Sequence, residues 1–267
     1  YLKRETSCMN ILDLNGRTAF VTGAGQGVGH RIALTLAECG ANVVVNDFFE
    51  ERAKAVADEI GAGRAVGIGG DVTDFASVSS LADKALSAFG KVHILVNNAG
   101  NASAGAQTPT GRPFWEQDPW EWDAFVGVNF TGVMNCCRAF LPGMIANANG
   151  SIINIISDAG RVGEAGLEVY SGAKAGAAGF TRAIARSTGR FGVRANCVAI
   201  ATTRTPTTAA FLDNPDFAKR ALSKYVIRRF GAPDDVANMV AFLASDTASS
   251  WITGQTYPVN GGFDMSM

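Results

Sequence analysis

Short runs of apolar, mostly β-branched residues alternate along this chain with longer stretches in which apolar positions recur at a helical period. The short runs are almost continuously apolar, as is typical of parallel strands buried on both faces. The longer stretches are typical of the helices that cover such strands. We therefore predict strands at residues 18–22, 42–46, 64–69, 92–96, 151–156, 194–198 and 255–259, and helices at residues 27–39, 50–60, 75–89, 120–145, 169–190 and 233–243.

This alternation continues without a linker rich in proline, glycine or serine and without a shift in composition. It predicts an α/β fold with a single domain, a doubly wound (Rossmann) parallel sheet of about seven strands with helices on both faces. The domain would comprise residues 9–267. Residues 1–8 lack the apolar core of a signal peptide, so we interpret them as an upstream extension or a cloning remnant, with Met9 a plausible native start.

The charge balance argues against highly charged partners. The chain of 267 residues carries 23 basic and 24 acidic side chains, a net charge of −1, and no basic stripe stands out. We therefore expect neither nucleic acid nor an anionic membrane surface as a partner. No apolar run is long enough by this reading to span a bilayer.

Cysteine and histidine usage argues against a metal centre. The five cysteines are odd in number, two are adjacent, and none forms a Cys-x-x-Cys pair, so neither a disulfide framework nor a zinc site is indicated. Free thiols fit a cytoplasmic location. His30 and His93 are far apart in sequence, and we interpret both as structural or surface residues.

A glycine cluster follows the first predicted strand and opens the first predicted helix. Gly23, Gly27 and Gly29 allow a tight turn and a close approach of the backbone to a pyrophosphate, while the helix start offers free N–H groups. A merely structural turn is the alternative. The position between a strand and a helix favours a dinucleotide site.

Asp47 ends the second predicted strand, 18 residues after Gly29. A carboxylate at this place can accept hydrogen bonds from the ribose of adenosine and repels a 2′-phosphate. Gln26 in the loop is uncharged, and Phe48 rather than a cation follows Asp47. These residues predict NAD rather than NADP, although Asp47 could also serve only as a turn former.

Tyr170 and Lys174 are four residues apart in a predicted helix and so share one face of it, with Ser157 thirteen residues before the tyrosine. An ammonium group beside a phenol favours the phenolate, so we expect the pKa of Tyr170 to be lowered. Tyrosine normally titrates near about 10, and a lower pKa would make it a usable general acid and base. The spacing alone also fits an ordinary surface pair.

In order and spacing, these motifs resemble the short-chain dehydrogenase/reductase family over about residues 10–263. The resemblance rests on Thr22-Gly with Gly27-Val-Gly29, Asp71-Val72, Asn97-Asn-Ala-Gly100, Asn129 within Val-Asn-Phe-Thr-Gly, Ser157, Tyr170-x-x-x-Lys174 and Asn260-Gly-Gly262. It implies an NAD-dependent oxidoreductase that interconverts a secondary alcohol and a ketone, in a homo-oligomer that is a tetramer or a dimer. It also implies a cofactor half at about residues 9–155 and a catalytic and substrate half at about 156–267.

The resemblance also implies a role for each matching residue. Tyr170 would exchange the proton with the substrate oxygen, and Ser157 would hydrogen-bond that oxygen. Lys174 would bind the nicotinamide ribose and lower the pKa of Tyr170, and Asn129 would hold a water of a proton relay. Tyr170 would also contact the cofactor, and the remaining cofactor contacts would come from Val28, Phe48, Asp71, Val72, Asn98, Ala99, Gly100, Thr203 and Thr205, beside the glycines, Gln26 and Asp47.

Three departures from the family pattern lie near the expected pocket. Ile200-Ala201 stands where Pro-Gly is usual, Asn260 replaces an aspartate before Gly-Gly, and residues 101–118 are longer than is common. The first removes a fixed φ and a permissive residue beside the nicotinamide. The third is expected to rim the pocket with Pro109, Pro113, Phe114 and Trp115.

The expected lid, residues 207–225, combines apolar and basic side chains: Phe211, Leu212, Phe217, Lys219, Arg220, Lys224 and Tyr225. This mixture fits a hydrophobic or cyclic alcohol or ketone, aromatic or steroidal, or one with an anionic group. The stretch from Ile156 to Gly163 resembles members that oxidise cyclic hydroxyacyl-CoA, with Arg161 available to a phosphate. Open alternatives are an ordinary amphipathic lid, a catalytically weak nucleotide-binding or regulatory protein, and an epimerase or dehydratase on the same fold.

Overall fold

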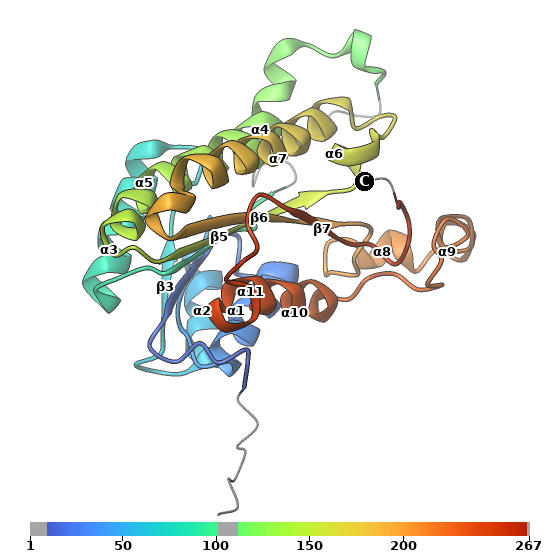
Figure 1. Cartoon of the computed structure of the whole chain (residues 1–267). Helices are drawn as coiled ribbons and strands as arrows, with labels where there is room; N and C mark the ends of the chain where they lie inside the picture. Colours follow the sequence, from blue (N-terminus) through green and yellow to red (C-terminus); the bar gives the residue numbers. More distant parts are fainter. Residues whose placement is uncertain (1–9, 101–111, 266–267) are drawn as a thin grey trace, which may run out of the picture.

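Seven parallel strands form one sheet in the order β3-β2-β1-β4-β5-β6-β7 in the computed structural model, which describes residues 10–100 and 112–265 (Figure 1). The α/β doubly wound fold predicted from the sequence is confirmed. The strand bounds lie within two residues of those predicted: β1 Thr18–Val21, β2 Asn42–Asp47, β3 Ala65–Gly69, β4 Ile94–Asn97, β5 Gly150–Ser157, β6 Val193–Ile200 and β7 Thr256–Val259.

Helices cover both faces of this sheet because successive strand residues point to opposite sides. On β1, Ala19 and Val21 pack with the buried faces of α1, α2 and α10, whereas Phe20 packs with α3 and α5. Figure 1 shows α1, α2 and α10 on one side of the sheet and α3, α5 and α7 on the other. The bounds are α1 Gly27–Glu38, α2 Glu50–Ile60, α3 Phe75–Phe89, α5 Gly132–Ala146, α7 Glu168–Thr188 and α10 Pro233–Ala244.

The strand order reverses beside β1. The chain moves from β1 outward to β2 and β3, then returns to β4 on the other side of β1. The helices that follow β1 and β4 therefore leave the sheet in opposite directions, and a crevice opens at the carboxyl ends of these strands. The residues singled out in the sequence follow the strand ends that border this crevice.

The predicted helix 120–145 is a continuous helical run whose geometry changes along its length. It begins as the 3₁₀ turn η2 Pro119–Trp122 and continues as α4 Asp123–Val126, the π-helical turn η3 Gly127–Thr131 and α5. π-Turns are rare and often accompany functional side chains. Here the π-turn contains Asn129, which is fully buried.

The same run corrects the expectation that no segment is long enough to cross a membrane. Residues Pro119–Ala146 are sufficient for a span by length and composition. In the fold, however, one side of the run is buried at helical spacing against the sheet, as in the core helix of a globular domain, by Val128, Val133, Cys136, Cys137, Phe140 and Met144.

Several short elements were not predicted, because one or two helical turns carry too little periodicity. They are η1 Phe114–Glu116, α6 Ala159–Val162, η4 Gly189–Phe191, α8 Ala209–Leu212, α9 Pro215–Leu222 and α11 Asp246–Ser249. The expected lid therefore contains two helices, α8 and α9. Residues 1–9, with the proposed extension and Met9, and residues 101–111 of the expected rim, with Pro109, lie outside the described residues.

Candidate active site

A cavity of about 1470 Å³ opens at the carboxyl ends of the strands, where the sheet order reverses. Its walls come from both predicted halves of the chain. With the exception of Asn129, every residue predicted for the site lines it: Gly23, Gln26, Gly27, Val28, Gly29, Asp47, Phe48, Asp71, Val72, Asn98, Ala99, Gly100, Ser157, Tyr170, Lys174, Thr203 and Thr205.

The glycine loop between β1 and α1 has no room for side chains at Gly23 and Gly29. A Cβ on Gly23 would lie 2.8 Å from the Cα of Ala99, and one on Gly29 would lie 2.3 Å from the carbonyl oxygen of Gly23. Gly23 and Gly27 also adopt φ values of 59° and 60°, in the left-handed region that favours glycine. The loop therefore presents bare backbone and the start of α1 to the cavity, which fits the pyrophosphate of a dinucleotide.

Asp47 is buried at the end of β2 and is fixed by two backbone hydrogen bonds. Its Oδ2 accepts from the N–H of Gly25 at 3.0 Å, and its Oδ1 accepts from the N–H of Phe49 at 3.1 Å. Arg52 also lines the cavity, with its guanidinium 4.4 Å from the centre of the Phe49 ring. Arg52 was not predicted from the sequence, because it lies in the first turn of α2, five residues after Asp47, rather than directly after it.

Asn98 ties the end of β4 to the glycine loop. Its side-chain amide donates to the carbonyl oxygens of Thr22 and Gly23, both at 3.0 Å, while its backbone N–H donates to Thr22 Oγ1. Asp71, after β3, accepts from the backbone and the hydroxyl of Thr73 at 2.8 Å. The bonds of Asn98 join the ends of β1 and β4, and the bonds of Asp71 fix the turn that follows β3.

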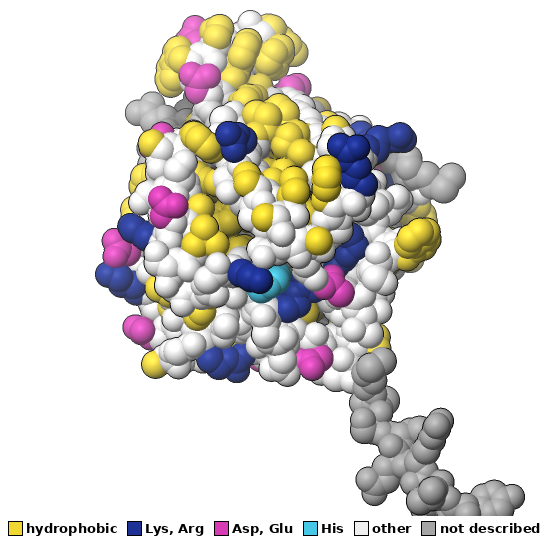
Figure 2. Space-filling view, turned by 60° about the vertical axis from the view of Figure 1, so that its left-hand side comes forward, with side chains coloured by type: hydrophobic (Ala, Val, Ile, Leu, Met, Phe, Trp, Pro, Cys, Tyr) yellow, Lys and Arg dark blue, Asp and Glu magenta, His cyan; other side chains and the backbone are white. Residues whose placement is uncertain are grey.

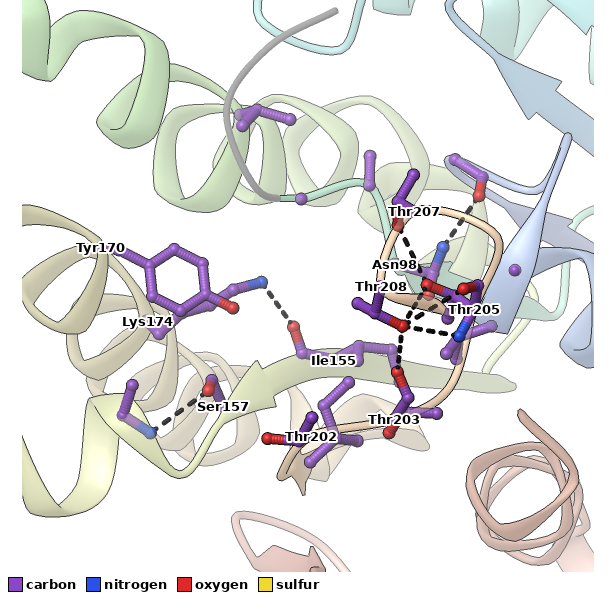
Figure 3. Close-up of a pocket in the computed structure, with 18 of the residues that line it drawn as sticks. Asn98, Ile155, Ser157, Tyr170, Lys174, Thr202, Thr203, Thr205, Thr207 and Thr208 are labelled. Atoms are coloured by element: carbon purple, nitrogen blue, oxygen red, sulfur yellow. Dashed lines mark hydrogen bonds between the residues drawn. The ribbon is translucent and has the colours of Figure 1, made fainter. Parts of the chain in front are cut away.

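Ser157 and Tyr170 meet at the other end of the cavity. Ser157 is the last residue of β5, and its Oγ accepts a 3.2 Å hydrogen bond from the N–H of Ala159. Tyr170 lies in the first turn of α7, and Figure 3 shows its ring and the Lys174 side chain projecting from the same helix. The ring of Phe125 packs edge-on against the Tyr170 ring, with centroids 6.5 Å apart.

Lys174 and Asn129 converge on Gly100. A Cβ on Gly100 would lie 3.1 Å from Asn129 Oδ1 and 3.2 Å from Lys174 Nζ. Lys174 Nζ donates to the Ile155 carbonyl at 2.9 Å, and Asn129 Nδ2 donates to the Phe125 carbonyl at 2.9 Å. Asn129 is fully buried and lies behind the cavity wall rather than in it.

The pKa of Tyr170 is shifted in the opposite direction to the one predicted from the sequence. Burial raises the pKa of Tyr170 above its usual value, and the negative charge of Glu164 adds to this, whereas the hydrogen bond with Ser157 lowers it. Burial also lowers the pKa of Lys174 to about 8. The predicted lowering of the Tyr170 pKa by Lys174 was therefore wrong, because the removal of the phenol from water is the larger effect.

Threonines line the wall beyond β6, opposite Tyr170 (Figure 3). Thr208 Oγ1 donates to the Thr203 carbonyl at 2.8 Å and accepts from the N–H of Thr205 at 2.8 Å. Thr203 also pairs with Gly231, whose N–H donates to the Thr202 carbonyl. These bonds fix the conformation of residues 202–208. This segment follows Ile200-Ala201, the pair that stands where Pro-Gly is usual.

The lid contributes a mixed wall. Of the lid residues named from the sequence, Leu212 is instead buried, and Lys219 does not line the cavity. Phe263 near the carboxyl end was missed, since nothing in the sequence placed it at the pocket. The side chains that do line the cavity here are Phe211, Phe217, Arg220, Lys224, Tyr225 and Phe263.

The two histidines lie outside the cavity lining. His93 Nδ1 accepts a hydrogen bond from the N–H of Thr18 at the amino ends of the strands, away from the cavity. Burial lowers the pKa of His93. His30 pairs with Glu59 at the surface. Within residues 10–100 and 112–265, no three histidine, cysteine, aspartate or glutamate side chains gather as a metal site.

Comparison with known proteins gives concordant matches. The family model described as Enoyl-(Acyl carrier protein) reductase matches residues 23–264. The (2S)-[(R)-hydroxy(phenyl)methyl]succinyl-CoA dehydrogenase subunit BbsD of Thauera aromatica is 39% identical over 254 residues, covering 94% of this chain and 98% of that protein. The 3-oxoacyl-[acyl-carrier-protein] reductase FabG of Staphylococcus aureus is 38% identical over 252 residues, covering 93% and 98%.

Solved structures resemble the fold over nearly its full length. A putative short-chain alcohol dehydrogenase from Sinorhizobium meliloti 1021 superposes with a TM-score of 0.86 at 36% identity, covering 95% of this chain and 98% of that one. A gluconate 5-dehydrogenase from Burkholderia cenocepacia J2315, in complex with NADP and tartrate, gives a TM-score of 0.85 at 33% identity, covering 94% and 96%.

Proposed function

The chain belongs to the short-chain dehydrogenase/reductase family of oxidoreductases, and on this basis we propose that it is an NAD-dependent enzyme that interconverts a secondary alcohol and a ketone. The observation that carries this proposal is the convergence of Ser157, Tyr170 and Lys174 on one cavity that also contains the bare glycine loop. The three side chains are suited to proton transfer, and the glycine loop is suited to holding a dinucleotide.

When it is bound, the nicotinamide supplies or accepts the hydride. In ketone reduction Tyr170 donates its proton to the carbonyl oxygen, and in the reverse direction it takes the proton of the alcohol. Ser157 orients the same oxygen through its hydroxyl. Lys174, positive at neutral pH, binds the cofactor ribose, while Asn129 holds a water behind Gly100 that links the lysine to solvent.

We propose NAD over NADP on the basis of Asp47. Its carboxylate is held at the end of β2 by the N–H groups of Gly25 and Phe49, so it is not free to swing away from a 2′-phosphate. Arg52 is the nearby cation that a 2′-phosphate would meet. The fixed carboxylate favours NAD through repulsion and through hydrogen bonds to ribose hydroxyls.

We propose a hydrophobic or cyclic substrate, such as a hydroxyacyl-CoA or an aromatic or steroid alcohol. Phe125, Phe211, Phe217 and Phe263 supply apolar surface, and Arg220 and Lys224 add positive charge on the lid. Among the relatives, BbsD is named as a CoA thioester dehydrogenase. Aromatic walls with a few cations fit a ring-bearing acyl group with an anionic handle.

We also propose a homo-oligomer in the cytoplasm. Hydrophobic side chains gather on the projecting segment that carries η1 and η2 and on the surface beneath it (Figure 2). Trp115 and Trp120 of this segment are 81% and 62% exposed. Apolar surface of this kind commonly marks contacts between subunits. Free cysteines, of which Cys136, Cys137 and Cys197 are buried, fit a reducing compartment.

A panel of cyclic, aromatic, steroid and acyl-CoA alcohols and ketones, assayed with NAD(H) and NADP(H), tests the proposal. We expect net consumption of NADH with at least one ketone, at a rate that falls about a hundredfold or more in Tyr170→Phe. Turnover of a substrate without net change in NADH would indicate an epimerase or dehydratase. Tight NADH binding without turnover on any compound would indicate a nucleotide-binding protein and would contradict the proposed function.

A further inference from the structure

The chain turns back toward the cavity directly after β7. Gly261 and Gly262 adopt φ values of 60° and 76°, and the N–H of Phe263 donates to the Asn260 carbonyl at 3.1 Å, which closes the turn. A Cβ on Gly262 would lie 2.8 Å from the Cβ of Val226. The turn, residues 260–264, is therefore tightly packed against the last part of the lid.

On one side the turn holds the segment that follows Ser157. Asp158 is 1% exposed, and its Oδ2 accepts a 2.7 Å hydrogen bond from Asn260 Nδ2. Its Oδ1 accepts from Arg161 Nη1 at 2.8 Å, and Arg161 is also 3.2 Å from Asp264 Oδ2. We call Asp158, Arg161, Asn260 and Asp264 the carboxyl-terminal clasp.

The clasp explains why an amide stands at position 260. Asn260 Nδ2 donates both to Asp158 Oδ2 and to the Asp264 carbonyl at 2.8 Å, so the position needs a donor. Arg161 is the cation of the clasp, and the carboxylates of Asp158 and Asp264 already share it. A third carboxylate at 260 would face buried Asp158 without a proton or a cation between them, which is costly.

On the other side the turn holds the base of the lid. The N–H of Ile227 donates to the Gly261 carbonyl at 2.9 Å. Tyr225, 4% exposed, accepts a 3.1 Å hydrogen bond on its hydroxyl from the N–H of Thr202, and its ring lies 5.3 Å from that of Phe263. The turn thus connects the serine segment, the segment after β6 and the lid.

We propose that the carboxyl-terminal clasp is a positioning device for Ser157 and the lid, and that Phe263, which it holds in the cavity wall, limits the size of the substrate. Phe263 and Tyr225 line the same cavity as Ser157. The clasp residue Asp158 follows Ser157 directly, so a shift of the clasp moves the hydroxyl. The size limit rests on the proposed function, whereas the link between clasp and lid does not.

The link between the carboxyl-terminal clasp and the lid is tested without substrate, by hydrogen–deuterium exchange of residues 157–163 and 222–227. We expect Asn260→Asp to increase exchange in both segments, because Asp158 and the new carboxylate repel each other. The double variant Asn260→Asp with Asp158→Asn swaps amide and acid and should return exchange most of the way to the wild-type rate, because only the hydrogen bond to the Asp264 carbonyl stays lost. The exposed Asn147→Asp variant is the matched control, with wild-type exchange expected.

Kinetics separate positioning from a merely structural role. With a substrate from the panel, Asn260→Asp should lower kcat/KM by about tenfold to a hundredfold, with a nearly unchanged Kd for NADH, and the double variant should recover most of the loss. An Asn260→Asp variant that is folded but exchanges like the wild type in both segments overturns the proposal. So does failure of the double variant to restore exchange.

Phe263→Ala tests the size limit. We expect the ratio of kcat/KM for a bulky ketone to that for a small ketone to rise about tenfold or more, because removal of the ring opens the pocket. Met265→Ala, an exposed neighbour outside the cavity lining, is the control and should leave the ratio unchanged. An unchanged ratio in Phe263→Ala overturns the size limit. A wild-type enzyme inactive on every compound instead overturns the proposed function, and the exchange experiment still decides the link.

Discussion

Lys174 Nζ donates a 2.9 Å hydrogen bond to the carbonyl oxygen of Ile155, from a side chain that is only 4% exposed. The bond joins the second turn of α7 to β5, two residues before Ser157, and places the ammonium group against Gly100. Burial opposes the charge and lowers the pKa of Lys174 from 10.5 to about 8. The folded protein therefore holds a cation that costs stability and that the proposed reaction requires.

Replacing Lys174 with methionine should stabilise the cofactor-free protein at neutral pH and abolish turnover. Below pH 8 the folded wild type bears the cost of the buried charge, which a pKa difference of this size puts at up to about 3 kcal/mol. From pH 8 to 10.5 the unfolded lysine binds more protons than the folded one, so this cost is relieved and wild-type stability rises relative to the variant. Urea unfolding at several pH values measures the difference in unfolding free energy between the wild type and Lys174→Met.

Lys224→Met serves as the control, because Lys224 is exposed and its replacement removes a lysine without removing a buried charge. A gap between wild type and Lys174→Met that stays constant from pH 8 to 10.5 would contradict the lowered pKa of Lys174.

Tyr170→Phe should lower kcat by about a hundredfold to ten-thousandfold, the usual contribution of a positioned general acid. The phenyl ring keeps the edge-on contact with Phe125, so the pocket keeps its shape. The Kd for NADH, measured by fluorescence, should change less than about twofold, because the lost hydroxyl lies at the Ser157 end of the cavity. Retention of more than about a tenth of wild-type kcat would exclude Tyr170 as the acid.

The raised pKa of Tyr170 predicts a pH dependence that differs with direction. The phenol remains protonated at neutral pH, which suits it to donate a proton to a ketone, whereas alcohol oxidation needs the phenolate. We expect kcat/KM for oxidation to rise with pH, by up to tenfold per pH unit between about 7 and 9, and that for reduction not to rise. Initial rates in both directions at constant ionic strength measure this. Equal profiles in the two directions would contradict it.

Thr181 lies on α7 and joins this helix to the sheet below the site through buried hydrogen bonds. Its hydroxyl accepts from Asn154 Nδ2 at 2.7 Å and from Cys197 Sγ at 3.2 Å, and donates to the Ala177 carbonyl. Thr181→Val should therefore cost about 1–3 kcal/mol of unfolding free energy, because the Asn154 amide loses its partner in the core. Chemical denaturation measures the loss.

Thr35→Val is the matched control for Thr181→Val. The Thr35 hydroxyl is buried and has no hydrogen-bond partner among the residues that the structure describes. Its removal should be neutral or stabilising. Equal losses in the two variants would show that the exchange of a hydroxyl for a methyl group, rather than the hydrogen bonds of Thr181, sets the effect.

The sequence predicted the sheet well because most of its strands, β1, β2, β4, β5 and β6, are mainly apolar runs that are buried on both faces. It predicted the cavity lining because the motifs follow strand ends, and parallel strands bring those ends to one edge. The π-turn around Asn129, the clasp around Asp158 and the position of Phe263 depend on contacts between distant segments. No local pattern encodes them. The direction of the Tyr170 pKa was missed for the same reason, since it depends on how deeply the fold buries the ring.

Asp47→Ser should shift cofactor preference toward NADP. The substitution removes the charge that would repel a 2′-phosphate, and Arg52 in the same cavity is then the dominant nearby charge. We expect the ratio of kcat/KM for NADP to that for NAD to rise by about a hundredfold, since a close charge pair is worth a few kcal/mol at a partly buried site. The shift should be largely lost in Asp47→Ser with Arg52→Gln, if Arg52 receives the phosphate. Glu51→Ser, an exposed carboxylate in the first turn of α2, should leave the ratio unchanged. A wild-type enzyme that already prefers NADP would overturn the assignment of Asp47, because its fixed carboxylate would then tolerate the phosphate that it is proposed to exclude.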